Sequence, residues 1–143
     1  SMIKRKAIQP FLKIDIGQKK MMKLLNRNNT PEMHPKGWGH EAWIVNNDKY
    51  CGKLLFFKKD KKCSWHYHKI KDEVFYLQSG KLLVKFSDDD DLEASISTIL
   101  MPGDSFHVYV GLRHQMYAIE DSELFEFSTS HFEEDSYRII KGD

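Results

Sequence analysis

From about Lys49 onward, short apolar runs alternate with turn-forming residues at intervals of about eight to twelve residues. This spacing is typical of an antiparallel sandwich or a small barrel, and no long helical pattern interrupts it. We therefore predict an all-β fold, and eight strands suit a double-sheet jelly roll. The predicted strands are Tyr50–Phe57, Cys63–His68, Glu73–Gln78, Lys81–Phe86, Ser95–Leu100, Ser105–Val110, His114–Glu120 and Glu123–Ser128.

The residues before these strands have a different character. Residues 31–48 combine prolines and glycines with Trp38 and Trp43, which predicts a loop whose large side chains pack across the barrel. Apolar residues at helical spacing allow a short amphipathic helix over Gln18–Asn29. The chain of 143 residues is about one domain long. We predict a single domain with a basic N-terminal arm at 1–49, a barrel at 50–130 and a C-terminal tail at 131–143.

Charge is divided unevenly along the chain. Residues 1–62 carry 15 Lys and Arg against 5 Asp and Glu, whereas residues 63–143 carry 7 against 16. This asymmetry would let a basic segment meet an acidic barrel or partner subunit, but lysines without interleaved aromatic residues do not indicate nucleic-acid binding. No stretch approaches the roughly 18 apolar residues of a membrane-spanning helix. The basic N-terminal residues are not followed by the apolar region of a secretory signal, so we expect a cytoplasmic location and no membrane partner.

The most specific chemical feature is a histidine pair, His66 and His68, followed by Glu73. Alternate side chains of a strand share a face, so the two histidines would lie on the same side with Cα atoms about 6.6 Å apart. Two imidazoles at that spacing can bind one metal ion at nitrogen–metal distances of about 2.0–2.1 Å. A histidine pair alone is more often structural, so other residues must decide between the two interpretations.

The segment around these residues resembles the first motif of the cupin family. That motif is a glycine, five residues, His-x-His, three or four residues, Glu, six residues and Gly. This chain has His66, His68, Glu73 and Gly80 at the same spacings, with Asp60 in place of the leading glycine. Aspartate tolerates the backbone conformations that glycine adopts in turns, so the turn before the strand can survive this change.

A later segment is similar to the second cupin motif, Gly-x5-Pro-x-Gly-x2-His-x3-Asn. Gly103, Gly111 and His114 match it, whereas Tyr109 replaces the proline and Ala118 replaces the asparagine. None of these departures removes a metal ligand of the family. The two motifs stand in the family's order, and together they cover residues 50–130.

The resemblance implies a cupin double-stranded β-helix that holds a divalent metal ion and leaves one or two coordination positions for water or substrate. The implied ligands are His66, His68, Glu73 and His114. Three imidazoles and a carboxylate suit Zn, Fe, Mn, Ni or Co, and the sequence does not choose among them. The alternative is a barrel that keeps these ligands but binds metal only adventitiously. The other histidines have no place in the motifs and are predicted to be packed or surface residues: His34, His40, His107 and His131.

Two flanking segments resemble a narrower group. Trp38–Glu41 matches a Trp-Gly-x-Glu segment before the barrel, and Glu126–Thr129 matches a late strand that leads to an Asp-x-x-Arg ending, here Asp135 and Arg138. Both features are similar to those of sugar-active cupins of the mannose-6-phosphate isomerase and D-lyxose isomerase group. The alternatives are simple packing of the tryptophans and a surface ion pair or cap at the ending.

The strand that contains Glu126 offers a candidate catalytic residue. Alternation places Phe125 and Phe127 on one face and Glu126 and Ser128 on the other. If the polar face lines the barrel cavity, Glu126 is the candidate general base for aldose–ketose interconversion, although packing alone favours the phenyl rings inside. Further candidates for sugar or phosphate contacts are Lys53, Tyr76 and Arg113.

The sequence therefore predicts a metal-dependent isomerase or epimerase that acts on a sugar or sugar phosphate. One alternative is a cupin that binds or senses a sugar or other small ligand without turnover. Another is an iron-dependent dioxygenase, which uses similar ligands on this fold. Because a barrel of this kind leaves sheet edges that a second subunit commonly covers, we also expect a homodimer.

Overall fold

The structure, a computed structural model, describes residues 15–18, 24–25 and 31–143. The chain divides into two units, residues 1–30 and 31–143. In the first unit residues 16–18 form one helical turn, which Asp15 and Gln18 cap reciprocally through their side chains and backbone N–H groups. Most of the helix predicted over 18–29 lies outside the described residues. The described part of the chain contains no helix long and apolar enough to cross a membrane.

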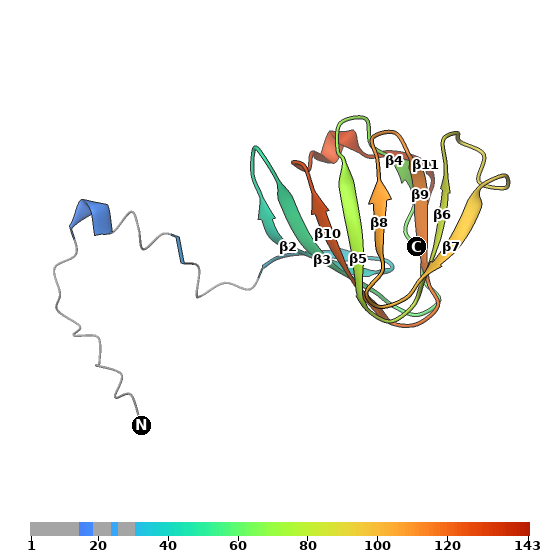
Figure 1. The fold of residues 1–143 in the computed structure, drawn as a ribbon, viewed down its shortest axis with the longest axis horizontal. Coiled ribbons are helices and arrows are strands. Elements are labelled where there is room, and N and C mark those ends of the chain that lie inside the picture. The colour runs from blue at the N-terminus through green and yellow to red at the C-terminus, as the bar shows by residue number, and fades with distance from the viewer. Residues whose placement is uncertain (1–14, 19–23, 26–30) are drawn as a thin grey trace, which may run out of the picture. The chain divides into compact units, whose positions relative to one another are not determined.

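Residues 31–143 form two antiparallel sheets that face each other (Figure 1). The all-β double-sheet jelly roll predicted from the sequence is confirmed. In spatial order, the first sheet contains β1 (Glu32–Lys36), β2 (Gly39–Asn46), β3 (Cys51–Phe57), β10 (Ser122–Ser128), β5 (Glu73–Ser79) and β8 (Ser105–Val108). The second contains β11 (Tyr137–Ile140), β4 (Trp65–Tyr67), β9 (Arg113–Ala118), β6 (Leu82–Ser87) and β7 (Ile96–Leu100).

The eight predicted strands correspond to β3–β10, and their ends differ from the prediction by at most two residues. The loop predicted over 31–48 is wrong, because β1 and β2 form a hairpin there that continues the first sheet beyond β3. Pro35 lies in β1, the edge strand, where a residue without a backbone N–H is tolerated. The tail also contributes β11, so strands extend beyond residues 50–130 in both directions.

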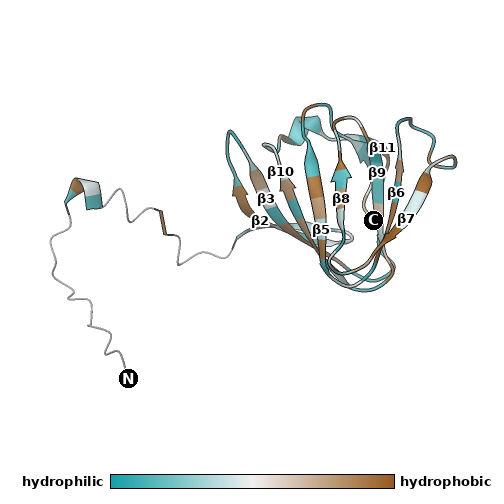
Figure 2. Ribbon diagram, viewed as in Figure 1, coloured by the Kyte–Doolittle hydropathy of each residue, from teal (hydrophilic) through white to brown (hydrophobic). Residues whose placement is uncertain are grey.

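The hydrophobic core occupies the space between the sheets and stops where the inward faces become charged. On β3, Leu55 faces the core and Lys53, two residues earlier, is buried as a charged residue. On β10 the same change separates Leu124 from Glu126. In Figure 2, β5 is hydrophilic where it begins, at Glu73, and hydrophobic along its middle. The strands therefore supply an apolar end that stabilises the sandwich and a polar end that is available for ligand binding or catalysis.

Two turns explain the glycine pattern of the first motif. Asp60 has a φ of 67°, in the left-handed region, and accepts a hydrogen bond from the Tyr117 hydroxyl at 2.9 Å. The expectation that aspartate can replace the motif's leading glycine is therefore confirmed. Gly80 has a φ of 90°, and a Cβ atom there would lie 2.3 Å from the carbonyl oxygen of Asp121. Only glycine fits that turn.

Replacing Leu124 with alanine tests the assignment of the two faces of β10. Leu124 is fully buried, so its truncation should lower the free energy of unfolding by about 2–5 kcal/mol. Phe127, on the opposite face of the same strand, is 55% exposed, and Phe127→Ala should cost less than about 1 kcal/mol. Urea denaturation of both variants makes the comparison. A larger loss for Phe127→Ala would show that the faces are assigned the wrong way round.

Candidate metal centre and cavity

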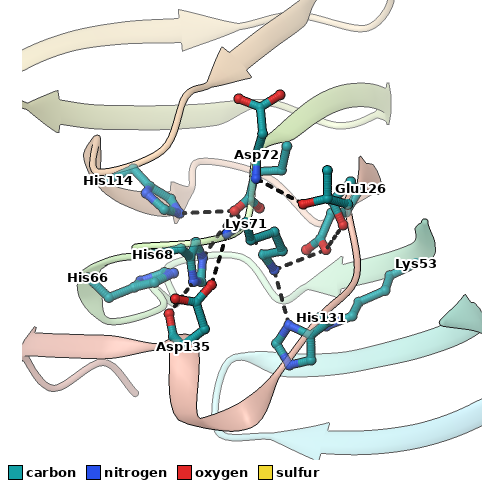
Figure 3. A network of polar contacts seen from close by, with 12 residues as sticks. Lys53, His66, His68, Lys71, Asp72, His114, Glu126, His131 and Asp135 are labelled. Atoms are coloured by element: carbon teal, nitrogen blue, oxygen red, sulfur yellow. Dashed lines mark hydrogen bonds and ion pairs between the residues drawn. The ribbon is translucent and has the colours of Figure 1, made fainter. Parts of the chain in front are cut away.

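Three histidines converge between the two sheets (Figure 3). His66 in β4 pairs directly with His114 in β9, and His68 follows the end of β4. The ring centroids of His66 and His114 are 4.3 Å apart, and those of His66 and His68 are 5.1 Å apart. One ring nitrogen from each histidine lies within 4.8 Å of the other two. Strand alternation and one cross-strand pair are therefore enough to assemble the cluster.

Backbone carbonyl groups orient all three rings. Nδ1 of His66, His68 and His114 each lies 2.9 Å from a carbonyl oxygen, those of Ser64, Asp135 and Leu112 respectively. A carbonyl oxygen only accepts, so each Nδ1 carries the proton and donates it, which leaves the Nε2 lone pair of a neutral ring free. Burial and the neighbouring rings lower the pKa of His66 well below its usual value and lower the pKa of His114 to about 3.

Glu73, the first residue of β5, adds a buried carboxylate from the opposite sheet. Its Oε2 lies 3.0 Å from Nε2 of His68 and 4.0 Å from Nε2 of His114, without hydrogen-bond geometry. Burial by itself would raise the pKa of Glu73, but the Lys71 charge and the contact with His68 outweigh it and lower the pKa. Glu73 is therefore ionised beside the histidine cluster.

The donor set fits a divalent metal ion. Among the described residues, Oε2 of Glu73 and Nε2 of His114 are the buried side-chain polar atoms without a hydrogen-bond partner. Buried polar atoms rarely lack a hydrogen-bond partner. Here the nitrogen offers a lone pair and the oxygen belongs to an ionised carboxylate, so both can bind a metal ion. Two ligand atoms bound to one ion at about 2.1 Å and a right angle are about 3.0 Å apart, which matches the contact between His68 and Glu73.

A cavity of about 260 Å³ adjoins this cluster. Its wall includes His66, His68 and Glu73 together with a second group of polar residues from the first sheet, the connection between β4 and β5, and the C-terminal segment. That second group contains Glu41, Lys53, Lys71, Glu126 and His131. The cavity thus has a histidine side and a charged side.

A buried ammonium group organises the charged side. Lys71 Nζ donates to Oε2 of Glu126 at 3.1 Å and to Nδ1 of His131 at 3.2 Å, and it lies 3.8 Å from Oε2 of Glu73. Burial by itself would lower the pKa of Lys71, but Glu73 and Glu126 raise it above its usual value. Burial and the charges of Lys71 and Lys53 lower the pKa of His131, so its ring is neutral and accepts.

A second ion pair lies deeper in the first sheet. Lys53 Nζ is 3.3 Å from Oε1 of Glu41 and 4.3 Å from the ring centroid of Trp43. The indole N–H of Trp43 donates to the same carboxylate oxygen at 2.8 Å. Burial alone would raise the pKa of Glu41, but Lys53 and the Trp43 hydrogen bond outweigh it and lower the pKa. The Trp38–Glu41 segment thus contributes a carboxylate to the cavity.

The structure brings together the five site residues that the sequence singles out: His66, His68, Glu73, His114 and Glu126. Glu126 is only 4% exposed and lines the cavity, so the polar face of β10 points inward. Lys53 also lines the cavity, whereas Tyr76 and Arg113 are not part of its wall. Arg113 instead stacks over Tyr67 and pairs with Asp90.

Sequence reasoning missed Lys71, and it singled out Glu41 only as part of the Trp-Gly-x-Glu segment, without a place in the site. His131, predicted to be a packed or surface residue, also lines the cavity. Lys71 occupies the variable spacer between His68 and Glu73, where nothing in the sequence distinguishes it from a solvated lysine. Its carboxylate partner Glu126 lies 55 residues away in the chain. Only the folded sheet places these charges together.

Comparison with known proteins agrees with this fold. The sequence profile of the cupin family matches residues 55–139. No curated protein matches the chain. CapF of Staphylococcus aureus, a capsular polysaccharide assembling protein, is 19% identical and superimposes with a TM-score of 0.65, covering 76% of this chain and 34% of CapF. The chain therefore spans about one third of the length of CapF.

Two further solved structures have the same fold. An RmlC-like cupin from Shewanella frigidimarina is 19% identical, with a TM-score of 0.63 and coverage of 76% of this chain and 92% of that protein. Oxalate decarboxylase of Bacillus subtilis, which has Mn(II) centres, is 18% identical, with a TM-score of 0.65 and coverage of 80% and 33%. At these identities the similarity establishes the fold.

Removing two histidines tests the metal centre. The double variant His66→Ala, His68→Ala should lose stoichiometric metal, because it removes two nitrogen donors and leaves too few ligands for a stable site. His107→Ala is the control, since that histidine pairs with Asp72 at the surface and belongs to neither motif. Elemental analysis of the purified proteins is the measurement. Stoichiometric metal in the double variant would place the site elsewhere.

Acidification should destabilise the metal-free protein. In the unfolded chain a histidine takes up a proton near pH 6.5, whereas His114 does so at about 3 in the folded protein. Below pH 6.5 the unfolded state therefore binds more protons, and the free energy of unfolding falls with pH by up to about 1.4 kcal/mol per pH unit for this ring. Urea denaturation between pH 7 and pH 5 measures the slope. His114→Gln should make the slope shallower, and an equal slope would contradict the argument.

Proposed function

The chain belongs to the cupin family, and from that premise we propose that it is a metal-dependent isomerase or epimerase acting on a sugar or sugar phosphate. The observation that carries the proposal is the position of Glu126, whose buried carboxylate lines the same cavity as the histidine cluster. Moving a proton between adjacent carbons needs a base held beside the reacting atoms. A carboxylate on the cavity wall meets that need.

We assign His66, His68, Glu73 and His114 as ligands of a divalent ion. When bound, such an ion supplies polarisation of the substrate's carbonyl and hydroxyl oxygens. Zn, Fe, Mn, Ni and Co all remain compatible with this donor set. The backbone carbonyl groups that accept from each Nδ1 hold the imidazoles in one orientation, so the ligands need little rearrangement.

Glu126 is assigned as the general base that takes the proton and returns it to the neighbouring carbon. Its Oε2 accepts hydrogen bonds from Lys71 Nζ at 3.1 Å and from the Ser128 hydroxyl at 3.0 Å. No described residue donates a hydrogen bond to Oε1. Lys71 and Ser128 therefore fix the carboxyl group through one oxygen and leave the other, Oε1, to take the proton.

The remaining polar residues of the cavity suit a ligand rich in hydroxyl groups. The Lys53–Glu41 and Lys71–Glu126 pairs each combine one positive and one negative charge, and both pairs line the wall. Charged donors and acceptors of this kind bind hydroxyl groups by charge-assisted hydrogen bonds. The similarity to CapF, a capsular polysaccharide assembling protein, supports a sugar-related ligand through the shared fold alone.

A non-catalytic cupin that binds or senses a sugar is the second candidate. The same ion pairs favour this candidate, because the two charges within each pair satisfy each other, and the pairs can bind a hydroxylated ligand without any proton transfer. Conversion of a substrate by the metal-loaded protein separates the two candidates. The homodimer and the cytoplasmic location stay predictions.

Replacing Glu126 with glutamine tests the catalytic assignment. Glu126→Gln preserves the shape of the side chain and removes its basicity, so the rate should fall about 100-fold or more, while metal content and fold are retained. Glu133→Gln is the control, because Glu133 also lines the cavity but its side chain is 66% exposed. The measurement is a screen of aldoses, ketoses and sugar phosphates with metal-loaded protein, followed by kinetics of both variants.

Two outcomes would count against the proposal. An unchanged rate in Glu126→Gln would exclude Glu126 as the base. A metal-loaded wild-type protein that converts none of these substrates but binds one of them would favour the sugar-binding cupin.

A further inference from the structure

Residues 68–72 join the two sheets at the cavity, and we call this segment the crossing. It leaves β4 in the second sheet at His68 and enters β5 in the first sheet at Glu73, and it carries Lys71 between them. This connection therefore supplies one residue to the histidine cluster and one to the charged side. A crossing without regular secondary structure has backbone N–H groups that need partners.

Asp135 supplies those partners. Its Oδ1 accepts the backbone N–H groups of Lys69 at 2.9 Å and Ile70 at 3.0 Å, and its Oδ2 accepts that of Lys71 at 2.9 Å. The backbone carbonyl of the same residue accepts the Nδ1 proton of His68 at 2.9 Å. Figure 3 shows Asp135 directed at this segment. One residue thus binds four consecutive residues of the crossing.

The hydrogen bonds of the Asp135 side chain are all made with this segment. Asp135 is 3% exposed, and its carboxylate makes no hydrogen bond to its own short helix, η1 (Glu133–Asp135). No lysine, arginine or histidine among the described residues lies within ion-pair distance of it, so the surface ion pair with Arg138 considered from the sequence is not formed. A buried carboxylate without a cation depends on its hydrogen bonds, and backbone N–H groups held by an ionised oxygen are strong ones.

We propose that Asp135 is a positioning residue that fixes His68 and Lys71 in their positions relative to each other. Its carbonyl aims the imidazole of His68, while its carboxylate holds the backbone from which the Lys71 side chain reaches Glu126. Loss of the carboxylate frees residue 135 from the crossing and so displaces the carbonyl that His68 uses. The inference rests on the metal centre of the proposed function, but it requires no turnover.

Cobalt(II) binding to the full chain tests the inference, because Co²⁺ suits the donor set and its visible spectrum reports ligand geometry. Asp135→Ala should weaken cobalt binding about 10- to 100-fold, the scale for loss of an outer partner of a metal ligand, and should change the visible spectrum. Asp135→Asn should have a smaller effect, since an amide oxygen still accepts a hydrogen bond. All titrations are done where circular dichroism shows the proteins folded.

Two control variants separate positioning from general loss of stability. Val84→Ala removes buried volume from the second sheet, away from the crossing, and should lower stability while keeping the wild-type cobalt affinity and spectrum. Asp72→Asn changes a carboxylate in the same crossing that is 47% exposed and faces His107, and it should also keep both. A loss of affinity in Val84→Ala equal to that in Asp135→Ala would reduce Asp135 to a structural residue.

Amide hydrogen exchange in the metal-free protein gives a second readout. The amides of residues 69–71 should exchange faster in both Asp135 variants than in wild type, and if Asp135→Ala does not fold, Asp135→Asn decides. Wild-type cobalt affinity, spectrum and amide exchange in an Asp135 variant would overturn the inference. A wild-type protein that binds no cobalt would overturn the metal centre itself, and with it the assigned role toward His68.

Discussion

The polar end of this sandwich depends on one buried ammonium group. Lys71 lies between the carboxylates of Glu73 and Glu126, and all three side chains are nearly inaccessible to water. Each charge would be costly to bury alone, and removing one partner of such a pair typically costs about 3–5 kcal/mol. The cluster therefore holds together as a unit, and it ties the segment that carries Lys71 to β5 and β10 of the first sheet beside the cavity.

Stability and chemistry are separated along the same strands. The inward positions of β3 and β10 that lie next to the core are leucines, and those two residues away are Lys53 and Glu126. The apolar end stabilises the fold through burial, which lets the other end hold ionised and unsatisfied groups that contribute little stability by themselves. Unsatisfied atoms such as Nε2 of His114 are the expected mark of a ligand site in a fold that is otherwise well satisfied.

Much of this protein could be predicted because the relevant signals are local. Period-two alternation and turn residues locate β3–β10, and the spacing of His66 and His68 places both imidazoles on one face whatever surrounds them. Asp60 could be accepted in a glycine position because its left-handed conformation is a property of the residue and the turn. β1, β2 and β11 were missed because these strands depend on the neighbours that pair with them. β1 and β2 pair with each other, β2 also pairs with β3, and β11 pairs with β4, and local composition does not reveal these neighbours.

The sequence by itself determined the fold class, which follows from spacing along the chain, and the candidate ligands, which follow from the resemblance of two segments to the cupin motifs. Only the tertiary structure decided which face of β10 points inward. Alternation places Glu126 and Phe127 on opposite faces of the strand, but it does not say which face is exposed to solvent. It also decided the contacts of Lys71 and Asp135, whose partners are 55 and 64 to 67 residues away. Side chains so distant in sequence meet only when the sheets close, and the energy of a buried charge depends on that meeting.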